Sequence, residues 1–410
     1  IAIVSGESYP VYSRPLISEY LAEKCSLERM MFRPADFYEK NNIRTFFGRK
    51  AERLDPAGKT VVLDSGEVIR WEKLLLATGG IPIVPPMKGV DQAGVFTFTT
   101  LDDAKAIDEY LTGNDRVVVI GGGLIGMSVT EALSKRGAEI SVVEMKDWVL
   151  NVMLDETAAA MVTARLEEIG INLVTGHTVA SINAEAGDIR SVTLDDGSGI
   201  PCRMVVVAIG VKPCIGLVEG TGIKVNRGIV VDRHMETSAR DVYACGDAAE
   251  AYDFVYDECR LSPIWPNAYQ GGRTAGRNMA GEPTEYPGGT AMNSLNYFGM
   301  DVISAGMVNP PDDSYEVLSR NDGGTYHKVV VKDGVVMGMV FVGNTEKSGI
   351  IYNLMKKRTN VEDFKEALVA EDFGLTSLPE ELWRPHLELP ATAVVSAVAT
   401  RETGQEVAGE

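Results

Sequence analysis

Three glycines, Gly121, Gly123 and Gly126, stand in the G-x-G-x-x-G spacing that can bind a dinucleotide pyrophosphate. They follow the apolar run RVVVI, which predicts a buried strand, and they open a helical stretch that begins with Leu124 and Ile125. Glycine lets the backbone approach a phosphate closely, and the helix N-terminus adds amide donors and a favourable dipole. The alternative is that these glycines serve only to pack the helix tightly on the strand.

A carboxylate follows at the distance that a dinucleotide ribose requires. Glu144 lies 18 residues after Gly126, at the end of the alternating run EISVVE. A carboxylate in this place accepts hydrogen bonds from both ribose hydroxyls and repels a 2′-phosphate. We therefore expect NAD(H) rather than NADP(H), although the nearby Lys146 weakens this preference.

Other side chains that could do chemistry are sparse. The five cysteines include no C-x-x-C pair, which argues against a disulfide scaffold or a zinc cluster and favours a reducing cytoplasm. The four histidines stand singly, so we expect no metal site. The net charge of −19 argues against a nucleic-acid partner, and the absence of any run of 18 apolar residues argues against a membrane span.

An internal repeat organises the elements that position these residues. Residues 48–80 and residues 176–210 both give a strand, an acidic glycine-containing turn, a second strand and an apolar strand that ends in A-[TI]-G. A strand–helix–strand unit, residues 116–144, precedes the second copy, and a further helix over about residues 154–169 lies between the two. Strands that alternate with helices predict a parallel sheet.

The first residues, IAIVS, align in this repeat with residues 140–144. We therefore expect the chain to begin at the second strand of an earlier nucleotide-binding unit, with about 24 residues of strand, glycine-rich turn and helix missing before it. A natural short start is the alternative, but it would leave one face of a sheet uncovered.

Four segments carry a family resemblance: LLLATGG (74–80), VVVIGGGLIG (117–126), VVVAIGVKP (205–213) and TSARDVYACGD (237–247). Through them, residues 1 to about 375 resemble the FAD-dependent pyridine nucleotide–disulfide oxidoreductase superfamily. The resemblance implies an α/β fold: two Rossmann-like three-layer nucleotide-binding domains, with the NAD domain inserted into the FAD domain, plus an α+β C-terminal domain. The expected ranges are 1–100 with 228–285 for the FAD domain, 101–227 for the NAD domain, 286–375 for the C-terminal domain and 387–410 for a flexible tail.

The resemblance also implies which residues bind the cofactors. In the family, the aspartate of the last motif hydrogen-bonds the ribityl chain of FAD, and that position is Asp247 here. The alternative for Asp247 is a helix N-cap after a buried strand. The other residues expected at the cofactors are Ala51, Ala77, Thr78, Gly79 and Gly246 on the FAD side and Ala208, Ile209 and Gly210 on the NAD side. Because the first glycine-rich motif is missing, we expect this chain to bind FAD weakly.

The segment YPVYSRPLIS bears on the electron acceptor. Relatives with a single redox cysteine place it here, whereas this chain has Arg14 and Pro15, and Cys25 lies further on. The Y-x-R-P-L pattern, which includes Tyr12, resembles rubredoxin reductases, ferredoxin reductases and the flavin portion of nitrite reductases, in which this segment packs beside the isoalloxazine. By that resemblance Arg14 stabilises negative charge on the flavin. The alternative for Arg14 is a surface salt bridge.

A second indication is SPIWPNAYQGG, residues 262–272. Ferredoxin reductases have a similar W-x-N-A segment, in which the Trp lies near the exposed flavin edge and the next helix points its N-terminus at the pyrimidine ring. The matching positions are Trp265 and Ala268, and the alternative for Trp265 is to fill a gap in the core. Ser128 stands where many relatives have a Glu at the nicotinamide, and we expect Cys245 and Cys259 to be buried small hydrophobes.

We therefore predict an FAD-dependent oxidoreductase that passes hydride between NAD(H) and flavin, and electrons between flavin and an iron–sulfur or rubredoxin-type protein. Arg14, Pro15 and Trp265 are the predicted catalytic residues. The alternatives are an NADH oxidase or coenzyme A disulfide reductase, and a non-catalytic NAD-binding sensor or assembly module. The resemblance also implies that the C-terminal domain forms a homodimer contact.

Overall fold

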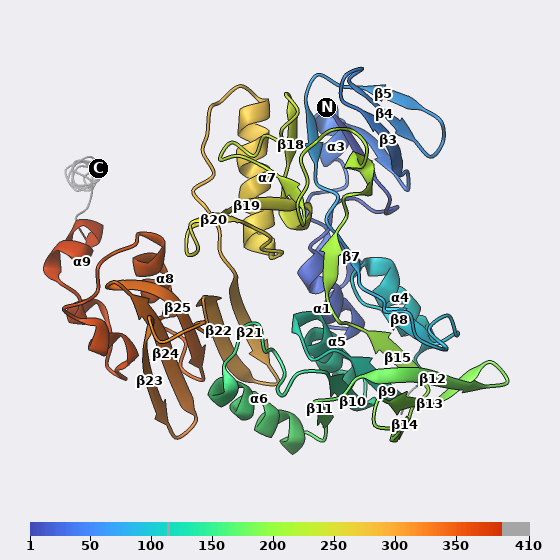
Figure 1. The fold of residues 1–410 in the computed structure, drawn as a ribbon. Helices are drawn as coiled ribbons and strands as arrows, with labels where there is room; N and C mark the ends of the chain where they lie inside the picture. The colour runs from blue at the N-terminus through green and yellow to red at the C-terminus, as the bar shows by residue number, and fades with distance from the viewer. Residues whose placement is uncertain (113–114, 388–410) are drawn as a thin grey trace, which may run out of the picture.

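The structure is a computed structural model that describes residues 1–112 and 115–387, so the tail predicted to be flexible lies outside the described residues except for Leu387. Figure 1 shows three bodies. The first body comprises the N-terminal segment, in blue, and a later segment, in yellow, that contains α7 (Trp265–Met279). The central body is cyan and green, and the C-terminal residues form the third body, in orange and red. This mixed α/β architecture confirms the predicted fold class.

The first strand, β1 (Ala2–Ser5), pairs in parallel with β2 (Arg44–Phe47). Short helices connect the two strands: η1 (Arg14–Leu16), α1 (Ile17–Leu21), α2 (Leu27–Met30) and α3 (Phe37–Lys40). Pro15 lies in the first turn of η1, where its missing N–H costs nothing. The segment YPVYSRP follows a bend after β1 and leads into this 3₁₀ turn, with Tyr12 in an isolated bridge to Met31.

Each copy of the repeat contains the predicted pair of strands and the apolar strand, and the structure adds a short third strand to the pair, which makes a three-stranded antiparallel sheet before the apolar strand. The first copy comprises β3 (Ala51–Asp55), β4 (Thr60–Leu63), β5 (Val68–Arg70) and then β6 (Leu74–Leu76). The second comprises β12 (Val179–Glu185), β13 (Asp188–Leu194), β14 (Gly199–Pro201) and then β15 (Met204–Val207). The next strands, β7 (Gly80–Pro82) and β16 (Val211–Pro213), pair with each other and link the first two bodies.

A five-stranded parallel sheet with the order β11-β10-β9-β15-β8 forms the centre of the second body. Its further strands are β8 (Val95–Thr97), β9 (Arg116–Ile120), β10 (Glu139–Glu144) and β11 (Asn172–Thr175), with helices α4 (Leu101–Tyr110), α5 (Leu124–Lys135) and α6 (Glu156–Glu168). Helix α6 begins two residues later than predicted because Asp155 caps it, accepting the Ala158 N–H at 3.0 Å. Strand β8 belongs to this sheet although the predicted NAD domain begins only at residue 101. The domain boundaries remain a prediction.

The chain then returns to the first body. This stretch comprises η2 (Gly216–Val218), β17 (Ile229–Val230), β18 (Val242–Ala244), η3 (Gly246–Ala248), β19 (Ala249–Asp253), β20 (Glu258–Arg260) and α7. Strand β18 pairs in parallel with β6, so segments far apart in the sequence share one layer. The buried residues of α7 are Gly271, Thr274 and Ala275, whose small side chains allow a close approach to that layer.

The C-terminal body is an antiparallel sheet with the order β21-β22-β25-β24-β23. Its elements are β21 (Met292–Tyr297), β22 (Met300–Gly306), β23 (Glu316–Asp322), β24 (Thr325–Lys332), β25 (Val335–Val342), α8 (Ser348–Lys356), η4 (Lys365–Val369), η5 (Leu375–Ser377) and α9 (Glu380–Leu387). A hairpin joins β24 to β25, and its turn residues Asp333 and Gly334 both have positive φ, 49° and 72°. A two-residue turn of this kind matches the twist of the strands that it connects.

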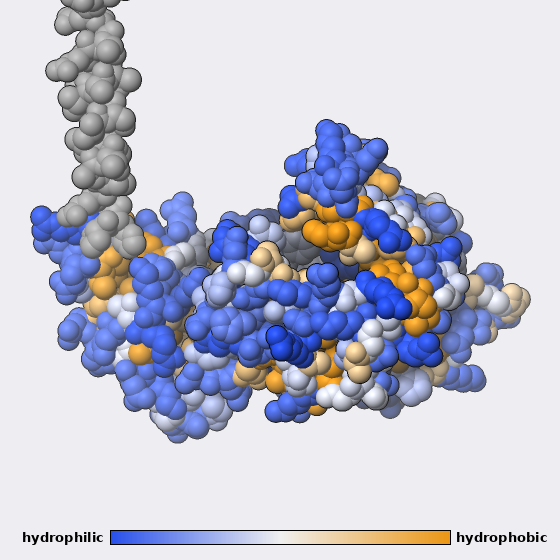
Figure 2. Space-filling model, turned by 90° about the horizontal axis from the view of Figure 1, so that it is seen from above, coloured by the Kyte–Doolittle hydropathy of each residue, from blue (hydrophilic) through white to orange (hydrophobic). Residues whose placement is uncertain are grey.

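Most of the surface in Figure 2 is hydrophilic, with apolar residues gathered in separate patches. In residues 1–112 and 115–387, no helix combines the length and the hydrophobicity that a membrane crossing requires. The large apolar and aromatic side chains that are exposed include Val11, Trp265 and Tyr269. The latter two belong to the site described next.

Candidate active site

The G-x-G-x-x-G loop joins β9 to α5. Gly121 has a φ of +106°, and a Cβ on it would lie 2.6 Å from the carbonyl oxygen of Ala208. A Cβ on Gly126 would lie 1.9 Å from the carbonyl oxygen of Gly121. Gly123 is the N-cap of α5, has no side-chain cap, and has open space on its Cβ side. The first and third glycines therefore permit close packing, while the second leaves the helix N-terminus accessible to a phosphate.

The Glu144 carboxylate lies against this loop. Its Oε2 accepts the Gly122 N–H at 2.7 Å, and its Oε1 accepts the Lys146 N–H at 2.9 Å. Glu144 is 8% exposed. Since a carboxylate can accept about four hydrogen bonds, both oxygens keep capacity for ribose hydroxyls.

The turn after β15 closes the other side of the loop. The Ala208 N–H donates to the Ile120 carbonyl oxygen at 2.8 Å. Gly210 has a φ of +115°, and Ile209, between these two residues, exposes 41% of its surface. Leu124 and Ile125, also predicted to contact NAD, lie half-buried in the first turn of α5. The structure thus brings the predicted NAD-side residues together around one loop.

A second group of predicted residues meets where β6 and β18 end. The Cys245 N–H donates to the Leu76 carbonyl oxygen at 3.1 Å, which places the residues after each strand side by side. A Cβ on Gly246 would lie 3.5 Å from the Cβ of Ala268, in the first turn of α7. The predicted FAD-side residues gathered here are Ala77, Thr78, Gly79, Gly246, Asp247 and Ala268.

Asp247 lies in η3, whose N-cap is Cys245, so it is not the helix N-cap of the alternative interpretation. Burial raises the pKa of its carboxyl group, and the positive charge of Arg14 opposes that shift. No residue in the described ranges donates a hydrogen bond to the Asp247 carboxylate. A carboxylate in this situation is available to accept hydrogen bonds from the hydroxyls of a ligand.

Arg14 is held on two sides. Its Nη1 donates to the Thr99 carbonyl oxygen at 2.7 Å, and its Nη2 forms an ion pair with Glu7. The Tyr12 hydroxyl donates to the other oxygen of Glu7 and accepts the Leu101 N–H at 3.0 Å. The Arg14 side chain is 49% exposed. Arg14 therefore forms the salt bridge of the alternative interpretation and also directs positive charge toward Asp247.

Glu7 and Thr99 were not predicted from the sequence. Thr99 contacts Arg14 through a backbone oxygen 85 residues away, which no local pattern indicates. For Glu7 a signal was present, since it is the first acidic residue after β1, two residues beyond Ser5, which aligns with Glu144 in the repeat.

Trp265 begins α7 and is 38% exposed, so it does not fill a gap in the core. The Trp265 and Phe32 ring centroids are 5.7 Å apart, and those of Phe32 and Tyr269 are 6.5 Å apart. Tyr269 is 54% exposed, and the Arg33 guanidinium lies 5.1 Å from the Phe32 ring centroid. Phe32, Trp265 and Tyr269 form an exposed aromatic patch at the N-terminus of α7.

Two positions lie apart from these groups. Ala51 starts β3, close to the end of β1, because the Arg49 N–H donates to the Ser5 carbonyl oxygen at 2.9 Å. Ser128 lies on α5 beside Tyr297 of the C-terminal body. Burial raises the pKa of Tyr297 to about 12, and a hydrogen bond with Ser128 partly offsets this rise. Ser128 therefore contacts the neighbouring body.

The five cysteines are free, and Cys25, Cys202 and Cys245 are buried. Burial raises the pKa of Cys245 to about 11, so its thiol is protonated at neutral pH. Cys259 is exposed, and the prediction that it is buried was wrong. The reason is its place in β20, the edge strand of the sheet with the order β17-β19-β20.

One group of potential metal ligands was not anticipated. The possible ligand atoms of His177, Asp195 and Asp196 lie within 4.8 Å of one another near the surface. Asp195 Oδ1 already lies 3.0 Å from His177 Nδ1 and accepts the Thr178 N–H at 3.3 Å. These hydrogen bonds account for the arrangement without a metal ion.

The donor sets fit two dinucleotides. The open Gly123 cradle and the two oxygens of Glu144 match a pyrophosphate and a ribose diol. The unpartnered Asp247 carboxylate, the exposed Arg14 guanidinium and the first turn of α7 match the ribityl chain and the electron-rich ring of a flavin.

Comparison with known proteins agrees with this assignment. The family described as pyridine nucleotide-disulphide oxidoreductase matches residues 1–272, and the rubredoxin NAD+ reductase C-terminal domain matches residues 292–359. The chain is 30% identical to the NADH-dependent phenylglyoxylate dehydrogenase subunit epsilon of Aromatoleum evansii, over 94% of this chain and 92% of that protein. It is 31% identical to the assimilatory nitrate reductase electron transfer subunit of Bacillus subtilis, over 87% of this chain but under half, 46%, of that relative.

Among solved structures, the NADH:rubredoxin oxidoreductase of Clostridium acetobutylicum is similar, with a TM-score of 0.75 and 26% identity over 92% of this chain and 93% of that chain. The family match covers well over half of the 410 residues. The chain therefore belongs to the pyridine nucleotide-disulphide oxidoreductase family, and it is an NAD(P)H-dependent flavoprotein oxidoreductase whose cofactors are FAD and NAD(H).

Proposed function

We propose that this enzyme exchanges electrons between NAD(H) and an iron–sulfur protein of the rubredoxin or ferredoxin type. The observation that carries this proposal is the exposed aromatic patch, which lies at the N-terminus of α7 beside Gly246 and Asp247. A surface of this kind next to a flavin gives a protein partner access within electron-transfer distance. Relatives named for rubredoxin reduction support the choice of partner.

The chemistry that a bound FAD would supply is acceptance of a hydride equivalent from NADH and release of electrons one at a time, which no side chain can do. The protein's own residues bind and orient the two cofactors. Gly121, Gly123 and Gly126 hold the NAD pyrophosphate, and Glu144 holds its adenosine ribose. Ala208, Ile209 and Gly210, with Leu124 and Ile125, line the same loop.

On the flavin side, the Asp247 carboxylate would accept a hydrogen bond from a ribityl hydroxyl, and Arg14 would stabilise negative charge on the ring. Tyr12 fixes Arg14 through Glu7, and Pro15 sets the turn in which Arg14 lies. Ala77, Thr78, Gly79 and Gly246 would let the backbone approach the cofactor, and Ala51, close to the end of β1, would contact it as well. Trp265 and Ala268, in the first turn of α7, would direct the helix N-terminus toward the ring.

A thiol-based reaction fits the site less well. In a coenzyme A disulfide reductase or an NADH oxidase with a redox cysteine, a thiolate contacts the flavin. Cys25 is buried, and its Sγ donates to the Ser26 carbonyl oxygen at 3.5 Å. Cys245 is held as a thiol by its raised pKa, about 11. Arg14 occupies the position after β1 where such a cysteine stands in those relatives.

An anaerobic titration tests the proposal. NADH added to the FAD-loaded protein should bleach the flavin absorbance, and oxidised rubredoxin or ferredoxin added next should restore it. NADH that binds without bleaching the flavin would instead indicate a sensor or assembly module. A reduced protein that is reoxidised by oxygen or coenzyme A disulfide, but not by either iron–sulfur protein, would refute the proposed acceptor.

We infer further that the enzyme works in a reducing cytoplasm, since its five cysteines are free. We also infer a homodimer formed through the C-terminal body, where Val317 of the outermost strand β23 is 45% exposed. Light scattering of the purified protein tests the dimer, and an exposed charge such as Val317→Glu should convert it to a monomer. A wild-type monomer would refute the inference.

A further inference from the structure

The first turn of α7 has little apolar packing to hold it. The buried residues of this helix begin at Gly271, in its second turn. Before that residue, Trp265 and Tyr269 are 38% and 54% exposed. Apart from the ring contacts of Trp265 and Tyr269 with Phe32, the hydrophobic effect therefore fixes the middle of α7 more than its N-terminus.

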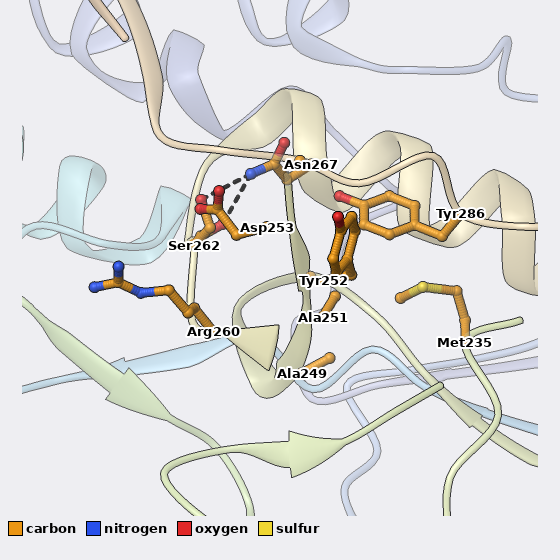
Figure 3. A pocket seen from close by; sticks show the side chains of 11 residues that line it. Met235, Ala249, Ala251, Tyr252, Asp253, Arg260, Ser262, Asn267 and Tyr286 are labelled. Carbon is orange, nitrogen blue, oxygen red and sulfur yellow. Dashed lines mark hydrogen bonds between the residues drawn. The ribbon is translucent and has the colours of Figure 1, made fainter. Parts of the chain in front are cut away.

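A small hollow lies beside this turn and is lined by polar side chains, such as those of Asp253, Ser262 and Asn267, together with apolar ones. Figure 3 shows Asn267 at its upper edge, with Ser262 and Asp253 on one side of it and, on the other, Tyr286, whose hydroxyl points toward Asn267. Because the buried residues of α7 lie beyond this turn, directed hydrogen bonds contribute to fixing its position.

Asn267 supplies those hydrogen bonds. Its Nδ2 donates to Ser262 Oγ at 2.8 Å, to the Ser262 carbonyl oxygen at 3.5 Å and to the Thr290 carbonyl oxygen at 3.2 Å. Ser262 precedes α7, and Thr290 belongs to the connection to the C-terminal body, so one amide group joins three segments. The N-cap residue, Ile264, has no side chain that could do this.

The orientation of the first turn matters because its backbone donors are available. The first helical hydrogen bond runs from the Ala268 N–H to the Ile264 carbonyl oxygen at 3.1 Å. Pro266 has no N–H, which leaves the amides of Trp265 and Asn267 to point out of the helix end. Positive partial charge at this end stabilises a negative ligand only while the turn keeps its direction.

We propose that Asn267 is a positioning residue that sets the redox potential of the flavin by holding the first turn of α7, with Trp265 and Ala268, in place. The proposal rests on the proposed function, because it takes the flavin to lie at this helix end. Without the Asn267 amide the turn frays, its donors lose their common direction, and the reduced, more negative flavin loses stabilisation.

The same helix offers a matched control at its other end. Asn278 Nδ2 donates to the His234, Thr274 and Thr284 carbonyl oxygens at 3.0, 3.1 and 2.8 Å. Its Oδ1 also accepts the Thr284 N–H at 2.9 Å, so Asn278 is the same residue type in the same helix and joins a helix end to neighbouring segments at least as firmly as Asn267 does. Asn278→Ala should therefore lower stability as Asn267→Ala does, but it should leave the flavin potential unchanged.

The experiment compares Asn267→Ala, Asn278→Ala and the wild type by redox titration of the FAD-loaded proteins. We expect Asn267→Ala to shift the equilibrium toward oxidised flavin by tenfold or more, which is about 30 mV for two electrons. We expect less than a twofold shift for Asn278→Ala. Asn267→Gln keeps an amide donor and should recover part of the shift.

A second measurement does not depend on the cofactor. In the flavin-free proteins, hydrogen exchange of the first turn of α7 should be at least tenfold faster in Asn267→Ala than in the wild type or Asn278→Ala. Equal exchange rates, or equal potentials in the two alanine variants, would overturn the proposal. If NADH fails to reduce the wild-type flavin, the proposed function fails, while the exchange comparison still decides the role of Asn267.

Discussion

Lys328 and Asp155 form an ion pair that joins the C-terminal body to the central body. Lys328 Nζ lies 2.8 Å from Asp155 Oδ2, and the two side chains are only 8% and 13% exposed. The Tyr326 hydroxyl donates to the same carboxylate oxygen at 2.7 Å. Asp155 also caps α6, so one carboxylate holds a helix end and an interface between bodies.

Lys328→Met should destabilise the protein. Removing one partner of a buried ion pair costs about 3–5 kcal/mol, and we expect about 3 kcal/mol here because Tyr326 and the Ala158 N–H still satisfy Asp155. Urea unfolding measures the loss. Lys332→Met on the same strand, whose ammonium bonds to Ser314 at the surface, is the control and should change stability by less than 1 kcal/mol.

The effect should depend on pH. Burial pushes the pKa of Asp155 upward, but hydrogen bonds from Lys328, Ala158 and Tyr326 outweigh it, so the pKa is lowered. A lowered carboxyl pKa stabilises the fold above the unfolded pKa, and that stabilisation is lost as the pH falls through the folded value. The difference between wild type and Lys328→Met should therefore persist from pH 5 to 7 and shrink below about pH 4. A difference that grows on acidification would contradict this assignment.

Glu144→Gln should weaken NADH binding and reduce the preference for NADH over NADPH. Hydrogen bonds to a charged group contribute about 1.5–3 kcal/mol, so we expect KM for NADH to rise by about tenfold or more while kcat changes little. The amide also no longer repels a 2′-phosphate. Steady-state kinetics with both nucleotides and a small-molecule acceptor measure both effects.

The control is Glu139→Gln, at the exposed start of the same strand, where Glu139 pairs with Arg116 at 3.1 Å. Glu139→Gln should leave KM for NADH and for NADPH unchanged. A wild-type enzyme that uses NADPH as well as NADH would disprove the role assigned to the Glu144 charge.

Local sequence patterns predicted the elements that are built from neighbouring residues. The strand–loop–helix unit at Gly121 follows from a buried run and glycine spacing within about 30 residues, and the structure has it as predicted. The contacts of Arg14 and Asn267 were not predicted. Their partners, Thr99 and Thr290, offer carbonyl oxygens 85 and 23 residues away, and a backbone oxygen carries no sequence signal.

Arg14→Gln should make the flavin harder to reduce. The variant loses a positive charge near Asp247 and the flavin ring, so we expect the two-electron midpoint potential to fall by about 30 mV, equivalent to about 1.4 kcal/mol. Spectroelectrochemistry measures the potential. Arg44→Gln, which removes an exposed Arg paired with Glu67 at 3.5 Å, is the control and should leave the potential within error. An unchanged potential in Arg14→Gln would show that Arg14 does not stabilise the reduced flavin and that its role is structural, through the salt bridge with Glu7.

The exposed aromatic patch should bind the protein acceptor. Two single variants, Tyr269→Ala and Arg33→Glu, test this. Tyr269 is 54% exposed in the patch, and Arg33 lies against Phe32. Since this chain carries a net charge of −19, an acidic electron carrier would need local positive charge to approach it, and Arg33 supplies such charge beside the patch. Each variant should lower kcat/KM for rubredoxin or ferredoxin by about tenfold, because aromatic and Arg side chains contribute most to interface energies, about 1–2 kcal/mol or more each.

Turnover with ferricyanide, which needs no docking surface, should stay unchanged. Arg320→Glu on β23 reverses a charge on the C-terminal body and should alter neither reaction. Equal losses with ferricyanide and with the protein acceptor would place the defect in flavin reduction instead of docking.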